Sequence, residues 1–77
     1  MLVIFNGAQA RSIRKEKGFH LAALAESADA TERYLSDLEH GKKRNPSAAY
    51  LYKISRALGV SMESLMQVIP DGDEQHR

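Results

Sequence analysis

The chain has 77 residues, a formal net charge of +1 and no cysteine, and 43% of its residues are hydrophobic. This length predicts one small domain that buries about 60% of its unfolded surface, and the lack of cysteine excludes disulfides and thiolate metal sites. The apolar start from Met1 to Phe5 has no positively charged flank and is too short for a signal peptide or a membrane span, so no membrane contact is expected.

The small net charge hides an uneven distribution. Residues 70–77 hold three acids and one arginine, so residues 1–69 hold ten basic and seven acidic side chains, an excess of three positive charges. Lys42, Lys43 and Arg44 form one basic run, and positive charge clustered on one face can bind phosphate. The alternative is that this run is a solvated loop. The tail, residues 70–77, is polar and is predicted to be disordered.

An apolar arm, residues 1–6, precedes the predicted domain. Two interpretations of Leu2 to Phe5 stay open. These residues could be a frayed N-terminus partly packed on the core, or a short arm, such as a strand, that packs across a dimer. We favour the first interpretation, because an exposed apolar arm promotes aggregation unless it is covered.

Helical periodicity and capping signals predict five helices and no strand, so the expected fold class is all-α. Asn6, Thr31, Ser47 and Ser61 are predicted N-caps, because their side-chain oxygens can accept hydrogen bonds from the first free N–H groups of a helix. The predicted helices cover, in chain order, residues 7–17, 21–28 and 32–40, then a helix between Ser47 and Gly59, and a fifth helix after Ser61 that carries Leu65 and Met66.

Residues 21–38 are the most informative segment, because they predict two short helices joined by a tight turn. Ala25 is small enough to let two helices cross closely, and Asp29 can take the left-handed conformation that such a turn often requires. Leu35 and Leu38 form the inward-facing side of the second of these two helices. This layout is typical of a helix-turn-helix, whose second helix lies in the DNA major groove.

Four segments, in this order, resemble the Cro/C1-type (XRE) family of helix-turn-helix regulators: IRKEKG at 13–18, LAALAESADA at 21–30, YLSDLEHGKKRNPS at 34–47 and ALGVSMESLM at 57–66. Within this family, RKEKG and NPS are most similar to the SinR-like regulators of Gram-positive bacteria. The resemblance implies a compact five-helix, lambda-repressor-like DNA-binding domain over residues 7–69. It also implies a cytoplasmic protein encoded by a prokaryote or a phage.

Three features depart from the family pattern. Leu21 stands where members usually carry a glutamine that contacts phosphate, and Asp29 replaces the glycine of the turn. The predicted third helix, which would be the recognition helix, carries the acids Glu32 and Asp37. Carboxylates repel phosphate, although they can accept a hydrogen bond from a cytosine amino group. These departures concern the target sequence and the affinity more than the fold.

The helix-turn-helix layout and the resemblance imply two sets of DNA-binding residues. Arg33 is the strongest base-reading candidate because a guanidinium can bind guanine O6 and N7 together. The alternative for this whole set is a solvated helix face, and for Tyr34 it is partial burial against the second helix. Phosphate contacts would position the protein without reading sequence. The base-reading set is Glu32, Arg33, Ser36 and Asp37, and the phosphate-binding set is Tyr34, Lys42, Lys43, Arg44 and Asn45.

The resemblance also implies a partly buried ion pair between Arg14 on the first helix and Glu39 at the end of the third, the alternative being two unrelated surface charges. A dimer interface is predicted on the fifth helix and its flanks. Methionines four residues apart share one helix face there, and methionine is common at adaptable contact surfaces. The predicted interface residues are Val60, Met62, Leu65 and Met66.

Together these features predict a sequence-specific DNA-binding transcriptional regulator, a repressor that binds a two-fold-symmetric operator as a homodimer. The rival hypothesis is a protein-binding module on a helix-turn-helix scaffold, such as an antitoxin or a regulator bound by an antagonist. Leu21, Glu32 and Asp37 keep that hypothesis open, while the basic run argues against it. The histidines lack metal-site spacing and no catalytic arrangement is apparent, so no enzyme activity, metal, cofactor or small-molecule ligand is expected.

Overall fold

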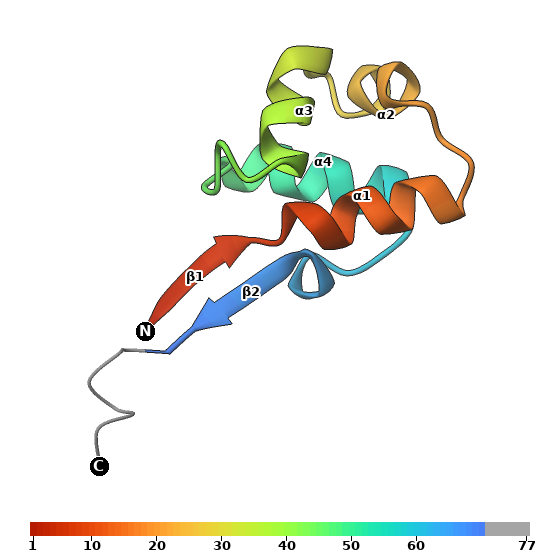
Figure 1. Cartoon of the computed structure of the whole chain (residues 1–77). Helices are drawn as coiled ribbons and strands as arrows, with labels where there is room; N and C mark the ends of the chain where they lie inside the picture. The colour runs from red at the N-terminus through yellow and green to blue at the C-terminus, as the bar shows by residue number, and fades with distance from the viewer. Residues whose placement is uncertain (71–77) are drawn as a thin grey trace.

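The computed structural model describes residues 1–70, so the tail predicted at 70–77 lies, apart from Pro70, outside the described residues. Four helices gather into one body, and two strands leave it together as a narrow ribbon (Figure 1). No helix in residues 1–70 is both long enough and apolar enough to cross a membrane. The elements, in chain order, are β1 (Leu2–Phe5), α1 (Gly7–Glu16), α2 (Leu21–Ser27), α3 (Glu32–Glu39), α4 (Ala48–Leu58), the short 3-10 helix η1 (Glu63–Leu65) and β2 (Met66–Ile69).

The prediction of an all-α domain with five helices is wrong. The four helices α1 to α4 are present, with ends within one residue of the predicted ranges, but the fifth is reduced to η1. Ser61 acts as a cap, since its Oγ accepts a hydrogen bond from the Ser64 N–H at 3.1 Å, yet only one turn follows. The chain then becomes extended as β2, where β-branched Val68 and Ile69 favour a strand and Pro70 cannot continue a helix.

The apolar start of the chain is the partner that makes β2 a strand. β1 and β2 pair antiparallel within the chain, with Leu2 opposite Ile69 and Phe5 opposite Met66. Two further backbone bonds fasten the base of this ribbon to the helices. The Phe5 N–H donates to the Arg44 carbonyl oxygen at 2.8 Å, and the N–H of the next residue donates to the carbonyl of Leu65 at 2.7 Å.

Local capping explains why the helices begin where they do. The side-chain oxygens of Asn6, Thr31 and Ser47 each accept a hydrogen bond from the backbone N–H three residues later, at 3.1, 3.1 and 3.2 Å. Each cap satisfies a helix N–H group that has no partner within the helix. These three caps fix the starts of α1, α3 and α4.

The core forms where α2 packs on α3 and α4 while α1 packs on α3 and η1. Ala25 on α2 and Ala28 directly after it are buried, and their small side chains allow this close helix packing. The large side chains that are fully buried at the centre are Leu24, Leu35, Leu38, Ile54, Leu58 and Leu65.

The fifth helix that was predicted to carry a dimer interface is replaced by η1 and β2, so the four predicted interface residues do not share one helix face. Leu65 is fully buried in the core, while Val60 and Met62 are half-buried and pack against it. Met66 is exposed, but it lies on β2.

The start of α1 lies directly against the end of α3, and Gly7 makes this approach possible. A Cβ atom at Gly7 would overlap the carbonyl oxygen of Leu38 and stand 2.9 Å from the carbonyl carbon and oxygen of Glu39. Both obstacles are backbone atoms, which cannot rotate away as a side chain can. The packing of α1 on α3 therefore requires glycine at this position.

Candidate nucleic-acid interface

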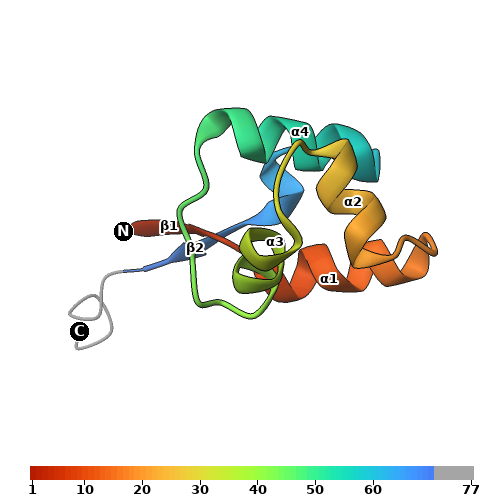
Figure 2. The ribbon, with the colours of Figure 1, turned by 90° about the horizontal axis from the view of Figure 1, so that it is seen from above.

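The turn between α2 and α3 has the tight geometry expected from the sequence. Asp29 adopts a left-handed φ of 57°, and the Ala30 N–H donates to the Ala25 carbonyl at 2.9 Å. Thr31 then caps α3. Viewed from above, α3 stands beside α1 and α2, and the loop that follows α3 swings round to reach α4 (Figure 2). This arrangement leaves the outer face of α3 uncovered.

The outer face of α3 carries the four predicted base-reading residues. Glu32 and Arg33 are exposed, and Ser36 and Asp37 are half-buried, while Leu35 on the opposite face is buried. The Arg33 side chain is 90% exposed and its Nε lies 3.9 Å from Asp37 Oδ2. An exposed ion pair of this kind contributes little stability, so the guanidinium can leave Asp37 for another acceptor.

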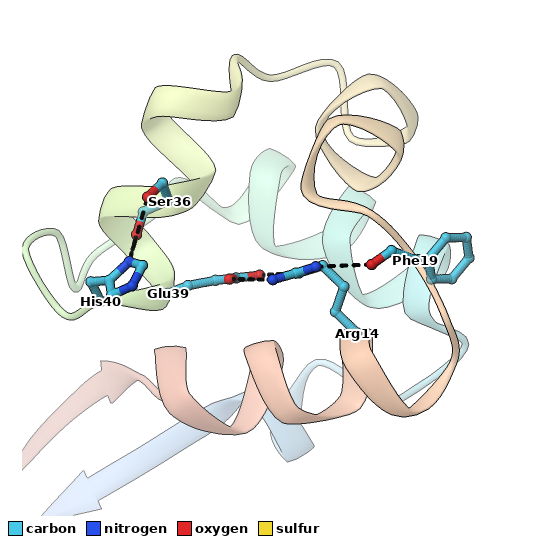
Figure 3. Close-up of polar contacts among 5 residues, drawn as sticks. All are labelled: Arg14, Phe19, Ser36, Glu39 and His40. Atoms are coloured by element: carbon cyan, nitrogen blue, oxygen red, sulfur yellow. Dashed lines mark hydrogen bonds and ion pairs between the residues drawn. The ribbon is translucent and has the colours of Figure 1, made fainter.

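His40 extends this face by one residue beyond α3. Its Nδ1 lies 2.8 Å from the Ser36 carbonyl oxygen and 3.4 Å from Ser36 Oγ (Figure 3). Because a carbonyl oxygen can only accept, Nδ1 is the protonated nitrogen that donates to it. The imidazole is thus fixed along the end of the helix.

The loop that contains Lys42, Lys43 and Arg44, here called the basic loop, follows directly on this face. All three side chains are exposed, and among the described residues none of them forms an ion pair. The backbone, in contrast, is fixed. The N–H groups of Lys42 and Lys43 donate to the Asp37 carbonyl at 2.9 and 3.2 Å, and the Arg44 carbonyl accepts from Phe5 of β1. The basic loop therefore presents exposed charged side chains on a backbone that hydrogen bonds hold in place. Asn45, also predicted to contact phosphate, is exposed beside it.

Beneath the interface, Arg14 and Glu39 join α1 to the end of α3. Arg14 Nε donates to Glu39 Oε2 at 2.7 Å, Nη2 donates to Oε1 at 3.0 Å, and Nη1 donates to the Phe19 carbonyl at 2.8 Å (Figure 3). The two residues are 8% and 5% exposed. The hydrogen bonds to Glu39 raise the pKa of Arg14, although desolvation opposes the rise, so the guanidinium stays charged. This bidentate ion pair fixes the position of α3 relative to α1.

Two residues of α4 that are not among the predicted site residues lie against the start of α3 and the turn before it. The ring of Tyr50 on α4 lies 5.0 Å, centre to centre, from that of Tyr34. Lys53 Nζ lies 5.9 Å from the Tyr50 ring centre and 3.5 Å from Asp29 Oδ2 in the turn. Tyr50 and Lys53 stand three residues apart on α4, so helical spacing places them on one face. That spacing is the signal that could have identified the pair.

Tyr34 is half-buried, but its aromatic contact is with Tyr50 on α4. Burial, followed by the nearby Tyr50, raises the pKa of the Tyr34 hydroxyl above its usual value. The hydroxyl therefore stays protonated at neutral pH and can donate a hydrogen bond to an anionic oxygen.

Leu21 opens α2 with an apolar side chain. It is half-buried and packs against the core, so it offers no polar group to a phosphate. Within residues 1–70, no group of three or more histidines or acids is placed to hold a metal ion.

The fold and this arrangement define a helix-turn-helix domain, with α2 and α3 as its two helices and an exposed basic loop after the second. The helix-turn-helix family HTH_3 matches residues 11–65. The chain belongs to this family, the Cro/C1-type or XRE family, and the resemblance to SinR-like members is confirmed.

Within this family, the chain is similar to individual regulators of known name. It is 40% identical over 70 residues to the HTH-type transcriptional regulator SinR of Bacillus subtilis, a match that covers 91% of this chain and 58% of SinR. It is 34% identical to the regulator SlrR of the same organism, covering 87% of this chain and 49% of SlrR. The chain thus spans about half the length of the curated relatives it matches.

Solved structures agree with the fold. The crystal structure of SinR, the master regulator for biofilm formation, in complex with DNA matches with a TM-score of 0.73 at 42% identity, covering 77% of this chain and 94% of that one. The complex of SinR with SinI matches with a TM-score of 0.72 at 37% identity, covering 92% and 65%. One relative of known structure therefore binds DNA, and binds a second protein in another structure.

Proposed function

We propose that this chain is a sequence-specific DNA-binding transcriptional regulator, a repressor that binds a two-fold-symmetric operator as a dimer. The observation that carries the proposal is the continuity between the outer face of α3 and the basic loop, both exposed and both on an anchored backbone. In a helix-turn-helix, the second helix enters the major groove while flanking basic groups contact phosphates. The presence of SinR on DNA in a structure of the same fold supports this assignment.

In this function residues 7–69 form the DNA-binding unit. The protein acts in the cytoplasm by occupying promoter DNA and catalyses no reaction. The curated relatives are transcriptional regulators by name, which agrees with a non-enzymatic role. No metal or cofactor takes part in the proposed mechanism.

Selection from a random duplex pool tests the proposal directly. The expected result is a two-fold motif whose half-sites lie about one helical turn, ~34 Å, apart. A pool that shows no enrichment, at a salt concentration where non-specific binding is detectable, would contradict sequence-specific binding.

The second candidate function is a protein-binding module. Leu21 offers no polar group to a phosphate, and the acids Glu32 and Asp37 place negative charge on the outer face of α3. The SinR relative is also seen in complex with the protein SinI. A chain that shows no selected DNA motif but binds one protein partner stoichiometrically would favour this candidate.

Loss of the positive charges of the basic loop is expected to weaken binding to all DNA sequences alike. Each phosphate contact removed by the triple variant Lys42→Ala, Lys43→Ala, Arg44→Ala should reduce the slope of log K against log salt by about 0.9. Fluorescence anisotropy on an operator and on an unrelated duplex measures both slopes. The matched control removes the same charge from α1 and its C-cap, where Arg11, Lys15 and Lys17 are exposed. Equal slope changes in the two triple variants would show that only net charge matters.

Arg33→Ala is expected to relax the preference at one base pair in each half-site, by ~1–3 kcal/mol, because its bidentate contact to guanine is lost. A set of operators with single base-pair changes, titrated with wild type and variant, gives this value. Arg56→Ala, an exposed arginine on α4, is the control and should leave the preference intact. If Arg33→Ala lowers affinity uniformly for every operator, Arg33 contacts phosphate instead.

A further inference from the structure

His40 lies between the base-reading face of α3 and the basic loop, and it belongs to neither set of predicted contacts. It is exposed and forms the C-cap of α3. Its backbone N–H and its ring Nδ1 both donate to the Ser36 carbonyl oxygen, at 3.0 and 2.8 Å. Figure 3 shows the ring turned back toward Ser36. The ring is therefore held in place at the junction of α3 with the basic loop.

The bond to Ser36 decides what the other ring nitrogen, Nε2, can do. A neutral imidazole carries one N–H, and here Nδ1 carries it because it faces a carbonyl oxygen. Nε2 of the neutral ring is then an acceptor, and no residue in 1–70 forms a hydrogen bond with it. The opposite tautomer would set the Nδ1 lone pair against the Ser36 oxygen. Nε2 therefore becomes a donor, with the bond to Ser36 kept, only when the ring is protonated.

The groove beside the ring is suited to an anion. His40 and Arg44 both line this groove, which has a volume of about 320 Å³. Glu39 lines it as well, but Arg14 binds both of its carboxylate oxygens. The residues that β1, the start of α1 and β2 contribute to the lining carry no charge. Arg44 is thus the one cation that already lines the groove, and His40 can become a second.

The remaining charged groups near His40 are on α3 and in the basic loop. Asp37 lies 3.9 Å from Arg33, and the side chains of Lys42 and Lys43 are exposed, so solvent screens their repulsion of a protonated ring. The last carbonyl groups of a helix favour a cation, and His40 is bonded to one of them. Bases are read chiefly by the first residues of a recognition helix, whereas His40 follows its last turn. Its position favours contact with phosphate.

We propose that His40 is a further phosphate contact, and that its ring takes up a proton when the chain binds DNA. A phosphate oxygen offers only lone pairs, so it repels the lone pair of a neutral Nε2 but accepts a charge-assisted hydrogen bond from a protonated one. Histidine is the side chain whose charge ordinarily changes between about pH 5 and 8, so little free energy is needed for the protonation. This inference rests on the proposed function, because it adds a contact to the same interface.

The affinity for DNA is therefore expected to rise as the pH falls, because the bound state favours the protonated ring. Fluorescence anisotropy on a duplex with one half-site of the selected motif should show binding about tenfold tighter at about pH 6 than at about pH 8, the effect of one hydrogen bond to a charged group. The slope of log K against log salt should be steeper by about 0.9 at the lower pH. An unrelated duplex should show both changes, since phosphate contacts carry no sequence information.

Three variants assign the pH dependence to one residue. His40→Gln cannot be protonated, so it should bind at both pH values as weakly as the wild type does at the higher pH. His40→Arg is positive at every pH and should bind tightly at both. The matched control is His20→Gln, an exposed histidine at the N-cap of α2 whose side chain makes no capping bond, and it should keep the full pH dependence. Both histidines are exposed, so the far-UV circular dichroism of all three variants should stay that of the wild type.

Three results would overturn the proposal. A wild type that binds equally well at both pH values would exclude proton uptake. A His40→Gln variant that keeps the pH dependence would assign the proton to another group. A pH dependence confined to the selected motif would place His40 against a base edge instead of a phosphate. Each of these results leaves DNA binding itself intact, whereas a wild type that binds no duplex at either pH would count against the proposed function as well.

Discussion

Glu39→Gln is expected to lower the free energy of unfolding by ~3–5 kcal/mol, because it leaves the buried Arg14 guanidinium without a counter-charge. Arg14 is 8% exposed, and two of its three hydrogen bonds go to Glu39. A domain of 77 residues has a total stability of roughly 4–12 kcal/mol. The variant should therefore be substantially unfolded at temperatures where the wild type is folded, which urea denaturation followed by circular dichroism would measure.

Two further variants show whether the pair itself is responsible. Glu63→Gln removes an exposed carboxylate from η1 and should leave the stability almost unchanged. Arg14→Lys keeps the positive charge but loses the planar guanidinium that binds both carboxylate oxygens and the Phe19 carbonyl. This variant should therefore be clearly less stable than the wild type as well. Similar losses for Glu39→Gln and Glu63→Gln would refute a structural role for the pair.

Gly7→Ala is expected to destabilise the domain by about 3 kcal/mol or more, the upper end of what overpacking costs. The sign is unusual, because replacing glycine by alanine within a helix normally stabilises it by up to ~1 kcal/mol. Here the new Cβ would overlap the carbonyl oxygen of Leu38 and crowd the backbone of Glu39. Since α3 would be displaced, affinity for DNA should fall together with the melting temperature.

Gly18→Ala is the comparison for this variant. Gly18 also has a conformation that favours glycine, with φ of 78°, but a Cβ there would meet nothing within 4 Å. Its loss should be limited to backbone strain, roughly 1–2 kcal/mol. If the two alanine variants lose equal stability, close packing between α1 and α3 is not the cause at Gly7.

The sequence predicted α1 to α4 well because the signals that begin and end these helices are local. Asn6, Thr31 and Ser47 each cap the N–H three residues ahead, so a short stretch of sequence contains both partners. Asp29 similarly sets the turn through its own conformation. Such features can be recognised without knowledge of the rest of the fold.

Features that depend on distant segments could not be predicted in the same way. The sequence predicts Met66 on a fifth helix, but Met66–Ile69 forms a strand because Leu2–Phe5, at the other end of the described residues, supplies the hydrogen-bonding partner. In the interface, the positions of the α3 residues followed from helical spacing. Helical spacing places Tyr50 and Lys53 on one face of α4, but their contacts with Tyr34 and the turn depend on how α4 packs, which that spacing does not show.

The pairing of β1 with β2 also has a consequence for biosynthesis. β1 leaves the ribosome before the helices, whereas its partner β2 emerges only after α1 to α4 have been made. During translation the helices can fold while LVIF remains an unpaired apolar edge, the kind of segment that promotes aggregation. Pairing of β1 with β2 is a late step that joins segments far apart in the sequence. This step should therefore limit the rate at which newly made chains reach the native fold.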